Sequence, residues 1–108
     1  MNKKIINLIG YASGAAAASP GCADGPEALR TSSQLAQLAA TQNLALDWTM
    51  LSPNKALSTS VAIVAALSQQ LAAVSEKSVM QHEAFCVIAG DHSSGIGTWS
   101  GVAKALRP

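Results

Sequence analysis

Asp91 and His92 are the residues of this 108-residue sequence that are best placed to do chemistry. They follow residues 85–89, a short run of apolar β-formers that stops at Gly90. Such a run predicts a buried strand, and the ligands of open α/β folds bind beside the carboxyl ends of such strands. The sequence therefore predicts a carboxylate and an imidazole at that edge of a sheet.

Two kinds of site fit this region poorly. A dinucleotide-binding turn is suggested by glycines at 95, 97 and 101, but the strand stops too early, at Gly90. The acid that such a site needs about twenty residues onward would also fall beyond Pro108. A serine nucleophile at Ser93 or Ser94 lacks the G-x-S-x-G turn that exposes such a hydroxyl.

A metal site is the third interpretation. His92 would give one imidazole nitrogen to a cation, and neighbouring strand ends would supply the other ligands. From the residue pattern alone, the default interpretation is a structural histidine that is hydrogen-bonded in a turn. The other histidine, His82, lies in a polar stretch over residues 75–83 and is expected at the surface.

The rest of the sequence alternates between strand and helix patterns. Strands are expected at residues 4–10, 45–51 and 85–89. Helices are expected at residues 24–43, from about residue 55 to at least residue 74, and at residues 95–106. Each of the first two helices follows a proline-containing start signal, Asp24 to Glu27 and Ser52-Pro53. The first two helices carry apolar stripes, expected to pack on the sheet: Ala28, Leu35, Leu38 and Ala39; and Ile63, Val64, Leu67, Leu71 and Val74. This alternation predicts an α/β fold with a parallel sheet and helices on its faces.

Composition limits the function. The chain is 49% hydrophobic with a net charge of +1, and residues 1–108 are expected to form one small domain. Because basic residues do not cluster, neither nucleic acid nor an anionic membrane is expected as a partner. Small molecules or other proteins are then the expected partners. No apolar stretch approaches the length of about 20 residues that a membrane span needs.

The cysteines favour a cytoplasmic protein. Cys22 and Cys86 lack zinc-type spacing and are too few for a disulfide scaffold, and Cys86 is expected to be inert inside an apolar strand. Lys3 and Lys4, followed by small and apolar residues before Cys22, superficially resemble a signal peptide. Polar residues and glycines interrupt that stretch, so a first strand is preferred.

Two motifs carry a family resemblance. The sequence Ala89-Gly90-Asp91-His92-Ser93, continued by Gly97-Thr98 and Ser100-Gly101, resembles the first metal-ligand motif of the arginase/agmatinase (ureohydrolase) family, Gly-Gly-Asp-His-Ser. Near the amino end, a strand closing on Gly10, a loop of small residues and Gly25-Pro26-x-x-Leu29-Arg30 also agree with that family. The one departure is Ala89 in place of the first glycine.

The resemblance implies a three-layer αβα sandwich around a parallel sheet, here reduced to about three strands and three helices. It implies a binuclear Mn²⁺ centre that hydrolyses a guanidino group, as in arginine or agmatine, in a homo-oligomer. His92 matches the family's first metal-binding histidine, and Asp91 matches the residue beside it, which orients the turn. The resemblance associates an Arg-rich pattern in the loop at residues 19–21 with agmatinases. This sequence lacks that pattern, which slightly favours an arginase-like protein.

Other features of the family pattern are not found in this sequence. The further ligands of the family lie in an Asp-x-His-x-Asp motif and an Asp-x-Asp motif, and neither is present. We therefore expect an amino-terminal portion that is inactive alone and that is oligomeric, aggregation-prone or only partly folded because its sheet has open edges. The alternative is a non-catalytic α/β fragment or interaction module.

Overall fold

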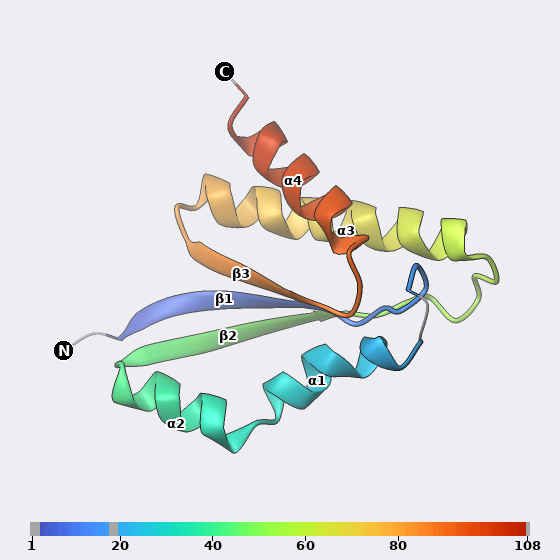
Figure 1. Ribbon diagram of the computed structural model, residues 1–108. Helices are drawn as coiled ribbons and strands as arrows, with labels where there is room; N and C mark the ends of the chain where they lie inside the picture. Colours follow the sequence, from blue (N-terminus) through green and yellow to red (C-terminus); the bar gives the residue numbers. More distant parts are fainter. Residues whose placement is uncertain (1–2, 18–19, 108) are drawn as a thin grey trace.

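The structure is a computed structural model that describes residues 3–17 and 20–107. Three parallel strands form one sheet in the order β2-β1-β3: β1 (Lys4–Tyr11), β2 (Leu44–Leu51) and β3 (Ala84–Ala89). Helices lie on both faces of this sheet (Figure 1). The predicted parallel α/β architecture is therefore confirmed, and all three strands lie within about one residue of their expected bounds.

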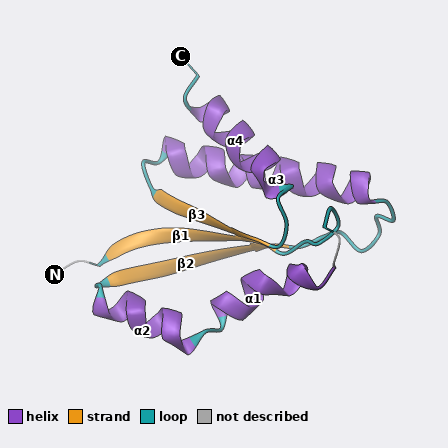
Figure 2. Cartoon of the chain, in the orientation of Figure 1, coloured by secondary structure: helices purple, strands orange, loops and turns teal. Residues whose placement is uncertain are grey.

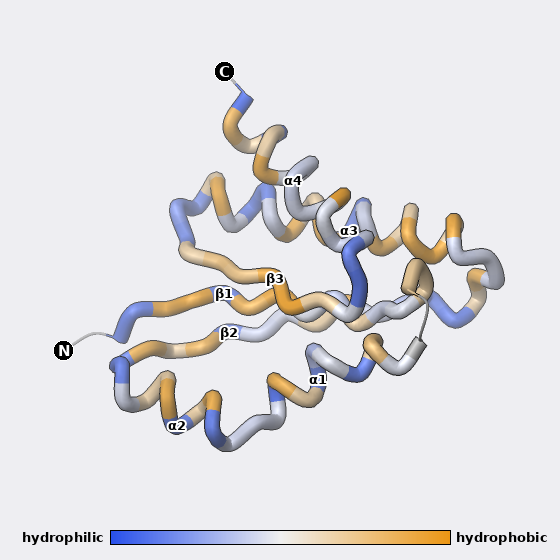
Figure 3. The backbone as a smooth tube through the Cα atoms, in the orientation of Figure 1, coloured by the Kyte–Doolittle hydropathy of each residue, from blue (hydrophilic) through white to orange (hydrophobic). Residues whose placement is uncertain are grey.

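The register brings the carboxyl ends of the strands to one level. Tyr11, the last residue of β1, pairs with Leu51 at the end of β2 and with Ala89 at the end of β3. The loops that follow the three strands consequently start from the same edge of the sheet (Figure 2). The turn after β3 is hydrophilic, whereas the strand before it is mainly hydrophobic (Figure 3).

The core lies between the sheet and α3 (Ser60–Met80). A second helix, α4 (Ser94–Ala105), packs on α3 and makes few contacts with the sheet (Figure 1). The buried core consists of residues from β1, β2 and α3: Ile9, Tyr11, Leu51, Leu67 and Leu71. The apolar stripe predicted for the second helix faces this core in large part, since Ile63 and Val74 pack against it. Val64 is the exception and lines a hollow together with Ile96 of α4.

Glycine and serine replace large apolar residues where α3 meets α4. Gly97 and Gly101 of α4 are buried, and a Cβ at either position would collide with α3. The hydroxyl of the buried Ser75 donates to the carbonyl of Thr98 at 3.2 Å. Gly97 and Gly101 therefore allow close helix packing, which accounts for these two glycines without a dinucleotide site.

Two predictions about where α3 begins and ends are wrong. The polar stretch over residues 75–83 was expected to be a connector, but α3 continues to Met80 and buries both Ser75 and Ser78. The start expected near Lys55 is wrong as well, because α3 begins at Ser60. Thr59 caps this helix by accepting a hydrogen bond from the amide of Ala62 at 3.2 Å.

The opposite face of the sheet carries two short helices in place of the single one expected over residues 24–43. These are α1 (Gly25–Arg30) and α2 (Ser33–Thr41), preceded by a 3-10 turn, η1 (Pro20–Asp24). Ser32 has an extended backbone, and its hydroxyl accepts from the amide of Leu35 at 3.3 Å, which caps a new helix. The predicted stripe fails in part as a result, since Ala39 is buried but Ala28 is exposed and Leu38 is 59% exposed.

β3 is less buried than its apolar sequence predicts. Val87 and Ile88 are half-buried, and Cys86 is exposed, which contradicts the expectation that these residues are buried inside the strand. β3 lies at an edge of the described sheet, where it contacts α3 on one face and the short helix α1 on the other. On the other face, α2 packs against β2, at the far side of the sheet.

Among the described residues, no helix is both long and apolar enough to cross a membrane.

Candidate functional site

His92 lies just past the carboxyl end of β3, beside the end of β1. The amide of Gly90 donates to the carbonyl of Tyr11 at 2.9 Å, which continues the pairing of β1 and β3 by one residue. The chain then turns sharply into α4, with the carbonyl of His92 accepting from the amide of Gly95 at 3.1 Å. The side chain of His92 is exposed at this edge, in the place expected from the sequence.

Asp91 holds the turn together. Its Oδ1 accepts from the amide of Ser93 at 2.9 Å and from the Ser93 hydroxyl at 2.5 Å. Its Oδ2 accepts from the amide of Ala16 at 3.1 Å, in the loop that follows β1. Both carboxylate oxygens are thus engaged within the protein, and Asp91 orients the turn that carries His92.

The electrostatics of Asp91 agree with this role. Partial burial by itself raises the pKa of the Asp91 carboxyl. Hydrogen bonds from the Ser93 side chain and from the amides of Ala16 and Ser93, together with nearby His92, outweigh burial and hold that pKa below its usual value. Asp91 is therefore a carboxylate at neutral pH, and it only accepts hydrogen bonds.

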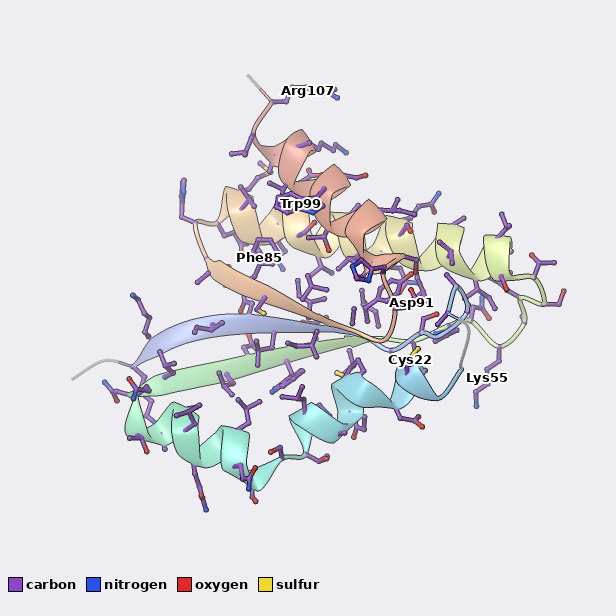
Figure 4. All side chains as sticks on the ribbon, viewed as in Figure 1. Cys22, Lys55, Phe85, Asp91, Trp99 and Arg107 are labelled. Carbon is purple, nitrogen blue, oxygen red and sulfur yellow. The ribbon has the colours of Figure 1, made fainter. Side chains whose placement is uncertain are left out.

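Gly90 lets three segments meet at this edge. A Cβ on Gly90 would lie 2.8 Å from the carbonyl oxygen of Cys22 and closer still to that of Ser13. Both obstacles are backbone atoms, so no side-chain rotation relieves them. Figure 4 shows Asp91 in the turn between β3 and α4, near the segment that carries Cys22. The long loop after β1 therefore packs directly against the site.

Tyr11 is a part of the site that sequence reasoning missed. Its ring is fully buried, and its phenolic oxygen lies 2.8 Å from the Oγ of Ser93. A tyrosine at a strand end reads as core in the sequence, because the contact depends on the register between β1 and β3. The Ser93 hydroxyl is held between Tyr11 and Asp91, which leaves a nucleophilic role for Ser93 without support.

The ligands that a metal centre needs are only partly assembled. The described part of the chain contains no group of three or more His, Cys, Asp or Glu residues that could hold a metal ion. His82 precedes β3 and so lies toward its amino end, away from His92. A hollow of about 270 Å³ at the site is lined by Ala89, Gly90, Asp91, His92, Ser94 and Gly95. One imidazole and one engaged carboxylate do not by themselves fit a binuclear Mn²⁺ centre, because that ion favours several oxygen ligands.

Comparison with known proteins identifies the family. The model of the Arginase family matches residues 4–108. The chain belongs to the arginase family. No match was found among curated protein sequences.

Solved arginases share the fold of this family member. It is similar to an arginase from Bacillus subtilis, with a TM-score of 0.80 and 27% identity over 94% of this chain and 34% of that one. A 1.7 Å structure of arginase from Bacillus subtilis subsp. subtilis str. 168 gives a TM-score of 0.76 and 25% identity, over 94% and 36%. Arginase from Bacillus caldovelox gives a TM-score of 0.70 and 25% identity, over 94% of this chain and 37% of that one.

These matches confirm the expected resemblance to an amino-terminal portion of the arginase family, and the arginase-like αβα layering. The chain spans about a third of the length of the arginases that it matches. The role of His92 as a metal ligand stays a prediction.

Proposed function

We propose that this chain is part of an arginase-like ureohydrolase that hydrolyses the guanidino group of a small substrate, such as arginine or agmatine, with a binuclear Mn²⁺ centre. The observation that carries the proposal is the Asp91-His92-Ser93 turn at the carboxyl end of β3, in a chain of the arginase family. In open α/β folds, ligands bind beside the carboxyl ends of the strands, and imidazole and carboxylate groups are the metal ligands that such an edge can supply.

In this proposal, His92 is one metal ligand and Asp91 orients it without binding metal. His92 is exposed and so accessible to a cation, whereas both oxygens of Asp91 already accept hydrogen bonds. The other ligands come from outside the described residues, which hold no ligand cluster of their own. Residues 1–108 thus form one part of a cytoplasmic arginase-like domain that assembles into homo-oligomers, and this part is inactive alone.

The alternative function is that of a non-catalytic α/β fragment or interaction module. It is favoured by the same observation that no metal-binding cluster is found within the described residues. Mn²⁺ occupancy separates the two proposals when it is measured in a protein that also contains the remaining ligands of an arginase domain, because an interaction module has no reason to bind Mn²⁺ through His92.

A turnover assay tests the proposed inactivity. The purified chain is incubated with excess Mn²⁺ and with arginine, agmatine or guanidinobutyrate, and urea release is measured beside the variant His92→Ala. We expect no turnover from either protein. Turnover that the substitution abolishes would show that a second copy of this chain supplies the other ligands, and the proposed inactivity would be wrong.

A further inference from the structure

A hollow of about 360 Å³ lies between α2 and β2, on the face of the sheet opposite α3 (Figure 1). On one side it is lined by small residues of α2: Ala36, Ala39 and Ala40. On the other side it is lined by larger apolar residues of β2: Leu44, Leu46 and Trp48. Small-molecule sites are mainly apolar clefts of about 300–1,000 Å³ with a few polar groups. The hollow therefore has the size and the walls of such a site.

The walls of the hollow are covered only in part. Leu46 and Trp48 of β2 are half-buried, as is Leu35 of α2, because the alanines opposite them are too short to fill the space. Removing apolar surface from water is favourable, so an apolar occupant would be stabilised here. The ring of Trp48 adds a wide apolar surface to one wall.

The charged residues that line the hollow, within the described part of the chain, are both basic. They are Lys3 and Arg30, and they lie at opposite ends. Lys3 adjoins Lys4, which pairs with Leu44 at the start of β2, beyond the end of α2. Arg30 lies near the other end of α2, beside the capping residue Ser32. The charge of the lining therefore favours an anionic occupant.

The Arg30 end is the better equipped of the two to hold a carboxylate. Of its five N–H donors, Arg30 uses one on Nε and one on Nη2 to bind Glu27, at 2.8 and 2.5 Å, which leaves three. The Ser32 hydroxyl accepts from the amide of Leu35 at 3.3 Å, so its own hydrogen can be donated. The positive end of the dipole of α2 lies at the same place. A carboxylate at this end would thus gain charge-assisted hydrogen bonds.

We propose that this hollow binds a medium-chain fatty acid anion, with its carboxylate at Arg30 and Ser32 and its chain along the apolar walls. The inference is independent of the proposed function. The hollow lies beside the amino-terminal half of β2, whereas His92 lies at the carboxyl edge of the sheet.

Tryptophan fluorescence tests the proposal, with decanoate below its micelle-forming concentration as the probe. The protein is the full chain with Trp99→Phe, because the chain has two tryptophans and Trp99 is 70% exposed on α4. Trp48 is then the reporter. We expect a saturable blue shift of its emission, and each methylene from hexanoate to decanoate should lower the concentration for half-saturation about two- to fourfold. Decylamine, which carries the opposite charge, should bind several-fold more weakly.

Two charge variants should change binding in opposite directions. Arg30→Gln should raise the decanoate concentration for half-saturation about three- to tenfold, the effect of one charge-assisted hydrogen bond. Glu27→Gln frees the guanidinium and should lower that concentration. Both variants lose the ion pair between Arg30 and Glu27, so a purely structural effect of that pair would move both in the same direction. Lys104→Gln removes a lysine of α4, away from the hollow, and should have no effect.

A third variant tests the place of binding. Ala36→Leu puts a larger side chain into the hollow and should abolish the saturable shift. Gln37→Leu is the matched control, because it adds the same side chain at an exposed position of α2 that does not line the hollow. Circular dichroism verifies that both variants keep the helix content of the parent chain.

Several results would overturn the proposal. Decanoate that leaves Trp48 emission unchanged, or that binds no better than decylamine, would rule out a site for an apolar anion. Equal binding by Ala36→Leu and Gln37→Leu would place the ligand elsewhere. Shifts in the same direction in Arg30→Gln and Glu27→Gln would remove the carboxylate from this end of the hollow. Each of these results would leave the proposed function, which depends on His92, untouched.

Discussion

Replacing Gly90 with alanine should loosen the edge of the sheet at which the site is built. The added Cβ would lie 2.8 Å from the carbonyl oxygen of Cys22 and closer to that of Ser13, whereas ordinary contact begins at 3.4 Å. The shortfall is about 0.6 Å for Cys22 and larger for Ser13, and both obstacles are backbone. Overpacking of this kind costs ~1–3 kcal/mol. The hydrogen bond from Gly90 to Tyr11, worth ~1 kcal/mol, would also be strained.

We expect a loss of ~2–3 kcal/mol in the free energy of unfolding. With a urea dependence of about 1.5 kcal/mol per molar, typical of a small domain, the midpoint of unfolding should fall by roughly 1–2 M. Circular dichroism at a fixed protein concentration measures this midpoint, because the helices dominate the signal. The concentration must be held constant, since association shifts apparent stability.

Gly95→Ala is the control for this substitution. Gly95 lies in the first turn of α4, and a Cβ there would meet no atom within 4 Å. Since alanine is a better helix former than glycine, this variant should unfold at the same or a higher urea concentration. An unfolding midpoint for Gly90→Ala that equals that of Gly95→Ala would refute the close approach of the three segments.

Two further predictions concern the packing of the helices and the open edge of the sheet. Gly101→Ala should lower the free energy of unfolding by ~1–3 kcal/mol in the same urea titration, because its Cβ would collide with Ser75 and with the backbone of α3; an unchanged midpoint would show that α4 does not pack as described. The chain should also self-associate, because β3 is a half-exposed apolar strand at a sheet edge. Size-exclusion chromatography with light scattering should then give a mass above 11.0 kDa, and a sharp monomer peak would count against the prediction.

The sequence predicted the strands and the position of His92 because both depend on local patterns. An apolar run that ends on glycine is a strand signal in itself, and a polar turn after a parallel strand must lie at its carboxyl edge. The family motif added the chemistry of His92, which no periodicity could supply.

The helix boundaries were harder to predict because short side-chain hydrogen bonds decide them. Asn54 accepts from the amide of Ala56 at 3.0 Å and so forms a turn where a helix start was expected. Ser32 and Thr59 cap the helices that begin after them, and neither stands out in the sequence from other serines and threonines.

Contacts between residues far apart in the sequence could not be predicted, for a different reason. Ser75 reads as a surface residue until α4 is placed against α3, and Tyr11 reads as plain core until the register of β1 and β3 brings it to Ser93. Contacts between residues 23 and 82 positions apart depend on the whole fold, and no local pattern in the sequence encodes them.

The central claim is that His92 is a metal ligand of an arginase-type centre, and bound Mn²⁺ tests it most directly. The test protein is a chimera in which this chain replaces the matched third of Bacillus subtilis arginase. Its Mn²⁺ content after dialysis is measured by elemental analysis, beside His92→Ala and the matched control His82→Ala. We predict that the chimera and His82→Ala retain equal Mn²⁺, and that His92→Ala loses at least half of it. Equal Mn²⁺ in all three proteins would contradict the claim.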